Sequence, residues 1–564
     1  MGNLLVAPIT EKETHRGVTE DGSLEYAVSS MQGWRIHMED AHICEAVLYA
    51  EEEIVNDTAS AEDQEVVSGI GHLRKKAKTM DDDGDDFFVD ADADTAGADV
   101  TTSTSPTEPS SASSLPNGDG STSPNAKNST RNTMATNTAT NTTTQTYRRM
   151  KLDGHSIFSV FDGHGGSFAA EYSGLNFVRV LSRQPSFIKY AMLINDLKAR
   201  DVPVDATLDN EAKDKDGLGS DRKLKLTPAE KAQIQLQMSK LLEGALRDAF
   251  LDIDREIWRE VHGYGNKDAI LPMNAMAKNK KEDDMENDND SSSNGDGQSP
   301  DGNGDGDDEK FHEATGGEDE WQQKQDSGTT AVTVMFTPQW IICANAGDSR
   351  SVYSKQGNCT IPLSYDHKPD DEAEERRIYD AGGFVRAGRV EGDLAVSRGL
   401  GDFRFKEDDL YKAMGDQMVS FSQYEDVSAV KRKKRGENGN VPEGSRSHIC
   451  SPVDQKVSPM PDIIVQNRNP DTDEFVVVAC DGIFDVCTNQ ECIAMTADIM
   501  EAGEKDLGLV CEEILDCCLE KGSKDNMTAL IVKMPAQKIG QGGGVAERRR
   551  LRAQAAVNAK RWCE

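Results

Sequence analysis

The chain has 564 residues, of which 63 are basic and 100 acidic, and its formal net charge is −37. This charge would repel the phosphate backbone of a nucleic acid, so direct nucleic-acid binding by the whole chain is excluded. The 11 cysteines lack metal-ligand spacing, and no signal peptide or apolar run of about 18 residues stands out. We therefore expect a reducing compartment, the cytoplasm or the nucleus, and no transmembrane segment.

Two inserts are too polar to pack. Residues 51–150 contain few large apolar side chains and many Thr, Ser, Asn and Asp, so burial cannot offset the entropy lost on ordering. A second insert, at about 263–325, carries 16 acidic against 2 basic residues between Lys281 and Glu320. Both are predicted to be disordered. The acidic insert either binds basic proteins or merely solvates the chain.

The rest of the sequence is patterned like one large domain. We predict a catalytic domain at 23–537, interrupted a third time by an enlarged polar segment at about 405–456. A basic tail follows at 538–564, which is either a docking or nuclear-import element or a solvated helix.

The predicted elements combine buried strands with amphipathic helices. In chain order they are a strand at 155–163, helices at 166–182 and 228–261, strands at 330–338 and 340–348, a helix at 370–381, a strand at 474–482, helices at 488–502 and near 506–519, and a strand at 527–535. Thr227, Pro228 and Glu230 form the capping signature of the long helix. The short gap after residue 338 requires an antiparallel hairpin, and the mixture predicts an α+β layered domain.

Acidic residues recur beside small residues at the ends of these strands. They are Glu39, Asp40, Asp162, Asp348, Asp481, Asp485 and Asp525. Carboxylates that converge from distant segments repel one another, and a divalent cation between them relieves the repulsion. Oxygen ligands suit Mg²⁺ or Mn²⁺, whereas Zn²⁺ would call for more His and Cys. The pattern therefore indicates a metallo-enzyme.

Two further residues direct this interpretation towards phosphate. Arg35, four residues before Glu39, offers a bidentate guanidinium to phosphate oxygens, and His164, beside Asp162, could protonate a leaving alkoxide. Two ions about 4 Å apart can activate a shared water for in-line attack on a phosphate ester. Taken singly, Arg35 would be a surface ion-pair partner and His164 a turn histidine, and these alternatives stay open from the residues alone.

Nine motifs appear in a fixed order: SSMQGWRIHMEDAH, VFDGHGG, SGTTAV, ANAGDSR, DHKP, GRVEGDLAVSRGLGDF, VSPMPDI, ACDGIFDV and SKDNMT. This series resembles that of the metal-dependent type 2C protein serine/threonine phosphatases and spans about 23 to 535. The resemblance implies a central β-sandwich of two antiparallel sheets flanked by helix pairs. It also implies hydrolysis of phosphoserine and phosphothreonine in proteins by a water that bridges two Mg²⁺ or Mn²⁺ ions.

The resemblance also implies a role for each metal ligand. Asp162 would bridge both ions, and the carbonyl of Gly163 would bind one of them. Asp481 and Asp525 would bind the first ion, and Glu39 the second.

The remaining site residues take roles from the same resemblance. Asp40 would hold metal-bound water, Arg35 would bind phosphate, and His164 would be the general acid. Asp348 and Asp485 match a third, weaker metal position found in some members.

The position of the acidic insert resembles that of the gamma subtype, and 405–456 falls where the family has its mobile flap. We expect phosphoprotein substrates and a monomer. Val6 departs from the myristoylation motif that Gly2 would otherwise begin, so membrane contact through an acyl chain is the weaker expectation. The alternative function is a catalytically weak phosphoprotein-binding scaffold of the same fold, which loss of a metal carboxylate would favour.

Overall fold

The computed structural model describes residues 4–54, 146–200, 226–272, 324–408, 411–412 and 451–563. Apart from Ile54 and Thr146, these residues belong to one compact unit formed by 1–53 and 147–564. Gly2 and most of the three predicted inserts lie outside the described residues. The ends of the first insert are described, and they form a strand pair.

One sheet has six antiparallel strands in the order β1-β2-β18-β17-β11-β12. Their bounds are Leu4–Val18 (β1), Glu25–Arg35 (β2), Met527–Lys533 (β18), Asp473–Ala479 (β17), Arg350–Lys355 (β11) and Cys359–Pro362 (β12). The predictions for β17 and β18 are confirmed. Strand β1 pairs with β2, so the sheet begins before the predicted domain start at residue 23.

The second sheet has five antiparallel strands in the order β16-β10-β9-β6-β3. Their bounds are Asp462–Asn467 (β16), Trp340–Ala346 (β10), Ala331–Phe336 (β9), Ser156–Phe161 (β6) and Ala41–Glu45 (β3). The predicted hairpin of β9 and β10 is confirmed, with Ala331 opposite Ala346. Every residue of β6, β9 and β10 is buried, as continuous apolar runs predict for strands covered on both faces.

Three small sheets complete the strand set among the described residues. They pair β4 (Leu48–Ile54) with β5 (Thr146–Leu152) and β13 (Val385–Arg386) with β14 (Arg389–Val390). In the third, the central strand β8 (Gly328–Thr329) pairs with β7 (Gly163–His164) on one side and β15 (Leu400–Gly401) on the other. Two 3-10 turns, η1 (Phe403–Phe405) and η2 (Pro452–Asp454), flank the part of the third insert that is not described.

The helices follow the predicted order, with additions. They are α2 (Phe168–Ser182), α3 (Pro185–Ala199), α4 (Pro228–Val261), α7 (Glu372–Asp380), α10 (Asp481–Phe484), α11 (Asn489–Glu501), α12 (Leu507–Lys521) and α13 (Gly544–Cys563). The capping box of α4 is present, since Thr227 Oγ1 accepts from the Glu230 amide at 3.3 Å and Glu230 Oε2 accepts from the Thr227 amide at 2.8 Å.

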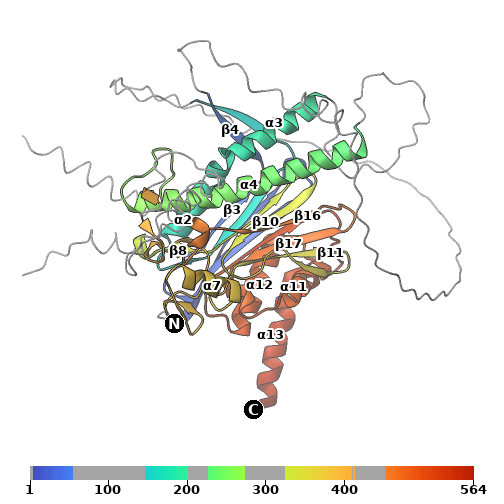
Figure 1. Ribbon diagram of the computed structural model, residues 1–564. Helices are drawn as coiled ribbons and strands as arrows, with labels where there is room; N and C mark the ends of the chain where they lie inside the picture. The colour runs from blue at the N-terminus through green and yellow to red at the C-terminus, as the bar shows by residue number, and fades with distance from the viewer. Residues whose placement is uncertain are drawn as a thin grey trace, which may run out of the picture. The chain divides into compact units, whose positions relative to one another are not determined.

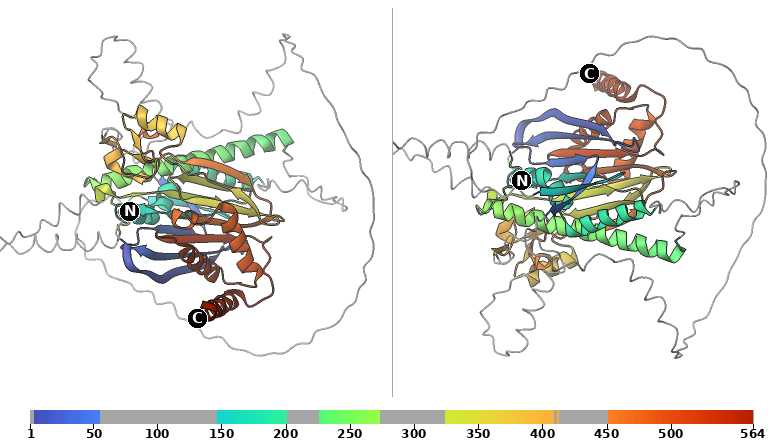
Figure 2. Two further views of the ribbon diagram at one scale, coloured as in Figure 1. Left: turned by 90° about the horizontal axis from the view of Figure 1, so that it is seen from below. Right: turned by 90° about the horizontal axis from the view of Figure 1, so that it is seen from above.

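Three apolar layers hold the sheets and helices together. The two sheets enclose one core, which includes Phe158 and Val334 from one sheet and Val476 and Leu530 from the other. The outer face of the five-stranded sheet packs on α2, α3 and α4, and that of the six-stranded sheet packs on α10, α11 and α12. Figures 1 and 2 show these helices on opposite sides of the paired sheets. The predicted β-sandwich flanked by helices is confirmed.

The basic C-terminal tail contains helix α13, which contacts α12. Arg552 donates to Glu513 Oε1 at 2.5 Å and Arg549 donates to Glu513 Oε2 at 3.1 Å, although the Glu513 side chain is only 1% exposed. A buried carboxylate requires such partners. Within the described part of the chain, no helix combines the length and apolar character needed to cross a bilayer.

Candidate metal centre

The antiparallel pairing brings the acidic motifs to one end of the sandwich. Asp162 follows the end of β6, while Asp40 precedes β3, whose first residue, Ala41, lies opposite Phe161. Asp481 follows β17 and Asp525 precedes β18. These two strand ends lie together because Ala479 pairs with Ala529. Strand ends that meet at the same edge therefore carry residues that are hundreds of positions apart in the sequence.

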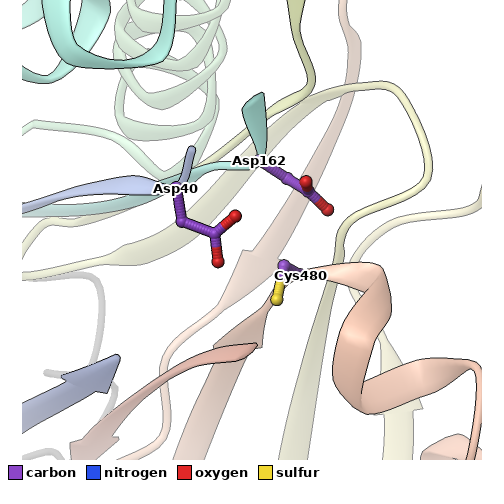
Figure 3. Close-up of side chains that lie close together, drawn as sticks. All are labelled: Asp40, Asp162 and Cys480. Atoms are coloured by element: carbon purple, nitrogen blue, oxygen red, sulfur yellow. The ribbon is translucent and has the colours of Figure 1, made fainter. Parts of the chain in front are cut away.

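Among the described residues, Asp40, Asp162 and Cys480 form a group of potential ligands whose donor atoms lie within 4.8 Å of one another (Figure 3). Asp40 Oδ2 accepts from Thr528 Oγ1 at 2.7 Å, whereas its other oxygen, Oδ1, is buried without a hydrogen-bond partner. A buried, unpartnered carboxylate oxygen is costly in a protein. It is the feature expected where a cation or its water completes the site.

The pKa values of the buried carboxylates reflect their mutual repulsion. Burial raises the pKa of Asp162 well above its ordinary value, and neighbouring carboxylates raise it further. Those neighbours are Asp481, Asp40, Asp348 and Asp525. Burial likewise raises the pKa of Asp481 well above its ordinary value and that of Asp40 to about 7. Burial and mutual repulsion thus disfavour the charged form of these carboxylates, and a divalent cation would relieve the same repulsion.

Cys480 is held as a neutral thiol. Burial, followed by the Asp40 and Asp162 carboxylates, raises its pKa well above the ordinary value. Its sulfur accepts from the Thr528 amide at 3.1 Å and contacts the Asn526 carbonyl at 3.5 Å. The sulfur is thus already hydrogen-bonded to the backbone, and the other two side chains of the group offer carboxylate oxygens. The residues present therefore fit Mg²⁺ or Mn²⁺ better than Zn²⁺.

Gly163 is required by close packing against the loop that carries Glu39. A Cβ at residue 163 would lie 2.2 Å from the Glu39 carbonyl oxygen, so any larger residue would displace that loop. The Glu39 carboxylate accepts from the Gly166 amide at 2.8 Å. Glu39 is thus positioned at the site edge by the VFDGHGG turn.

Arg35 and Asp525 contact each other. Arg35, the last residue of β2, donates to Asp525 Oδ2, and the other Asp525 oxygen accepts from the Asn526 amide at 2.7 Å. The residue predicted to bind phosphate and one predicted to bind metal are therefore paired in the structure. Binding either ligand as predicted would replace part of this contact.

His164 contacts a second buried acid. Its Nε2 is hydrogen-bonded to Asp402 Oδ1 at 2.8 Å, and the Asp402 side chain is 3% exposed. Burial alone would lower the pKa of His164, but the Asp402 carboxylate outweighs it and the pKa is raised. Asp402 has a backbone φ of 55°, a strained value for a non-glycine residue. Gly328 gives this carboxylate room, because a Cβ there would lie 2.3 Å from it.

The residues of the predicted third metal position lie close enough to Asp481 to raise its pKa. Asp348, at the end of β10, forms an ion pair with Lys368. Burial is the largest effect on the pKa of Asp485 and raises it. Lys368 lowers this pKa, and the Asp348 carboxylate raises it, each by less than burial does. Lys368 thus already supplies a positive charge where the resemblance implies a weak cation site.

Several residues that build the site received no role from the sequence. Asn526 joins two loops, since its Oδ1 accepts from the Glu39 amide at 3.0 Å and its Nδ2 donates to the Gln32 and His37 carbonyls at 2.8 and 3.0 Å. Lys368, Asp402, Cys480 and Thr528 were also missed. Each lies inside one of the nine motifs, and its place in a motif is the only sequence signal that points to it.

Comparison with known proteins agrees with this arrangement. Residues 252–527 match the sequence model of a family described as protein phosphatase 2C. The chain is 40% identical to protein phosphatase ppm-1.A of Caenorhabditis elegans over 210 residues, covering 37% of this chain and 36% of that protein. It is 35% identical to protein phosphatase 2C homolog 2 of Schizosaccharomyces pombe, covering 38% and 49%.

Human protein phosphatase 1A is 34% identical over 209 residues, covering 37% of this chain and 44% of that protein. The chain thus spans about half, or less, of the length of these curated relatives. A solved serine-threonine phosphatase 2C from Toxoplasma gondii matches 68% of this chain and 85% of that one at 17% identity, with a TM-score of 0.38, too low to support an argument. The family match and the curated relatives agree that residues 252–527, just under half of the chain, are similar to protein phosphatase 2C.

Proposed function

We propose that this protein is a metal-dependent phosphatase that removes phosphate from phosphoserine and phosphothreonine in proteins. The observation that carries the proposal is the group of buried carboxylates at one end of the sandwich, with Asp40 Oδ1 left without a hydrogen-bond partner. Similarity to protein phosphatase 2C makes phosphate esters the natural substrate of such a site.

The ligand roles proposed for the chain follow the motif positions. Asp162 would contact two divalent ions, Asp481 and Asp525 one of them, and Glu39 the other, with the Gly163 carbonyl as a further ligand. When bound, two Mg²⁺ or Mn²⁺ ions supply a nucleophilic water at neutral pH and balance the charge of the phosphate. The amide of Asp481 donates to Asp162 Oδ2 at 3.4 Å, which orients that carboxylate before any ion arrives.

Asp40 and the possible binding position for a third metal ion complete the proposed site. Asp40, fixed by Thr528, would orient the attacking water through its free oxygen. Asp348 and Asp485 would hold a third ion only if Lys368 moved away from Asp348.

Arg35 and His164 would act on the substrate itself. The Arg35 guanidinium forms an ion pair with Asp525 in the structure. It would turn from there to the phosphate oxygens and donate two hydrogen bonds to them. His164 keeps Nε2 on Asp402, so its Nδ1 proton would pass to the leaving serine or threonine oxygen. The Asp402 carboxylate raises the pKa of His164, which favours the protonated ring that a general acid requires.

Hydrolysis of p-nitrophenyl phosphate and of a phosphothreonine peptide tests the proposal. We expect turnover with Mn²⁺, loss of turnover with a chelator, and loss of turnover in Asp162→Ala and Asp481→Ala. The matched control is Asp498→Ala, which removes an exposed carboxylate from α11 and should behave like the wild type. Activity that persists with chelator or in both site variants refutes the metal-dependent reaction. Peptide binding without turnover in the wild type would instead identify a scaffold.

A further inference from the structure

Two buried thiols lie in contact beneath the surface beside the proposed site. Cys487 sits in the turn between α10 and α11, and Cys518 lies in the last turns of α12. Their sulfurs are 3.8 Å apart, although the residues are 31 positions apart in the sequence. Cys487 is 2% exposed and Cys518 fully buried.

A lysine side chain contacts one sulfur of this pair. The ammonium of Lys521 donates to Cys487 Sγ at 3.2 Å, and its own side chain is 39% exposed. Only the Lys521 side chain therefore separates the Cys487 sulfur from solvent. Its ammonium can balance negative charge on that sulfur when the sulfur attacks an oxidant. Cys517, next in sequence to Cys518, points elsewhere, since its sulfur is 3.6 Å from an Arg552 nitrogen.

The geometry permits a covalent link with a small movement. A disulfide bond is about 2 Å long, so the two sulfurs must approach by roughly 1.8 Å from their present contact of 3.8 Å. One partner is in a turn rather than in a helix, which leaves it freer to move. Adjacent cysteines such as Cys517 and Cys518 would strain a disulfide far more.

We propose that Cys487 and Cys518 form an oxidative modification site, which a peroxide converts to an intramolecular disulfide. Cys487 sulfur attacks one peroxide oxygen, the O–O bond breaks, and the products are a sulfenic acid and water. Cys518 sulfur then attacks the sulfenic sulfur, and the hydroxyl leaves as a second water. Two thiols are oxidised and one peroxide is reduced to two waters, with both thiol protons carried away in the water.

The link would act on the proposed active site, and this consequence rests on the proposed function. Asp485 lies two residues before Cys487, and α10 begins with Asp481. On the other side, Ser523, just past α12, donates to the Gly482 carbonyl at 2.7 Å, and Asp525 follows two residues later. Drawing α12 and the α10–α11 turn together would displace these carboxylates, and a shift of about 1 Å in a catalytic geometry can cost up to about 100-fold in rate.

Mass spectrometry of the full chain tests the disulfide directly. The protein is exposed to hydrogen peroxide, its remaining thiols are alkylated, and its peptides are mapped without reduction. We expect a cross-linked peptide pair containing Cys487 and Cys518 in the wild type and in the matched control Cys517→Ser. The pair should be absent from Cys487→Ser and Cys518→Ser. The proposal is overturned if both thiols stay alkylatable while other cysteines oxidise, or if either one pairs with another cysteine.

An activity measurement separates this inference from the proposed function. After peroxide, we expect Mn²⁺-dependent phosphatase activity to fall at least about tenfold in the wild type and to return with dithiothreitol. Cys487→Ser and Cys518→Ser should retain their activity after peroxide. If no activity exists before oxidation, the proposed function fails while the mass result still decides the disulfide. If the disulfide forms without affecting activity, the coupling to the site is refuted.

Discussion

Replacing Asp254 should destabilise the domain strongly, because this α4 residue neutralises a lysine that has no access to solvent. Asp254 Oδ1 accepts from Lys406 Nζ and from the Gly401 amide, both at 2.8 Å, and Oδ2 accepts from Tyr411 OH at 2.7 Å. The Lys406 and Asp254 side chains are both 0% exposed. Asp254→Ala would leave a buried ammonium without a counter-charge, which costs about 3–5 kcal/mol of unfolding free energy.

The assay is urea unfolding followed by tryptophan fluorescence, with an exposed ion pair as the control. Lys198 and Asp153 are also 2.8 Å apart, but their side chains are 44% and 68% exposed. Asp153→Ala should therefore cost at most about 1 kcal/mol. If Asp254→Ala costs no more than Asp153→Ala, the counter-charge of Asp254 does not stabilise the fold. Combining Asp254→Leu with Lys406→Met should recover most of the loss, because it removes both charges.

Four other changes probe the site. Because burial raises the pKa of Asp40 to about 7, its folded carboxyl binds a proton more tightly than the unfolded one. Stability of the metal-free protein should fall by up to about 1.4 kcal/mol per unit as pH rises from about 4 to about 7, and thermal melts should show Asp40→Asn flattening this loss. Asp402→Asn should lower the pKa of His164, moving the alkaline limb of the kcat profile to lower pH; an unmoved limb contradicts this. Arg35→Lys should reduce kcat/KM roughly 10- to 150-fold, and an unchanged value would exclude bidentate phosphate binding. Gly163→Ala should lower both the melting temperature and kcat, since its Cβ would lie 2.2 Å from the Glu39 carbonyl oxygen; wild-type values would refute the crowding argument.

Local signals predicted the elements whose cause is local. The capping box and the spacing of apolar residues predict α4, and continuous apolar runs predict the buried strands β6 and β17. Strand β1 could not be predicted in this way, because it is an edge strand with mostly exposed residues that is stabilised by pairing with β2. The order of strands in each sheet depends on similar long-range pairing, such as that of β2 with β18.

The candidate site shows the same division. The motifs indicated which carboxylates would gather, and the strand ends do bring Asp40, Asp162 and Asp481 together. The partners that orient them were not predictable. His164 and Asp402 are 238 positions apart, and nothing in either motif indicates their hydrogen bond. The Arg35 contact with Asp525 likewise results from the pairing of β2 with β18 rather than from either local sequence.

Anomalous X-ray scattering from crystals grown with Mn²⁺ is the decisive test of the two-ion carboxylate site, because it locates bound ions independently of any activity. We expect two strong peaks at the end of the sandwich, with Asp162 contacting both ions, Asp481 and Asp525 on one and Glu39 on the other. Absence of a peak at Asp162 in Mn²⁺-loaded crystals, or an ion bound through Cys480 sulfur in place of these oxygens, would contradict it.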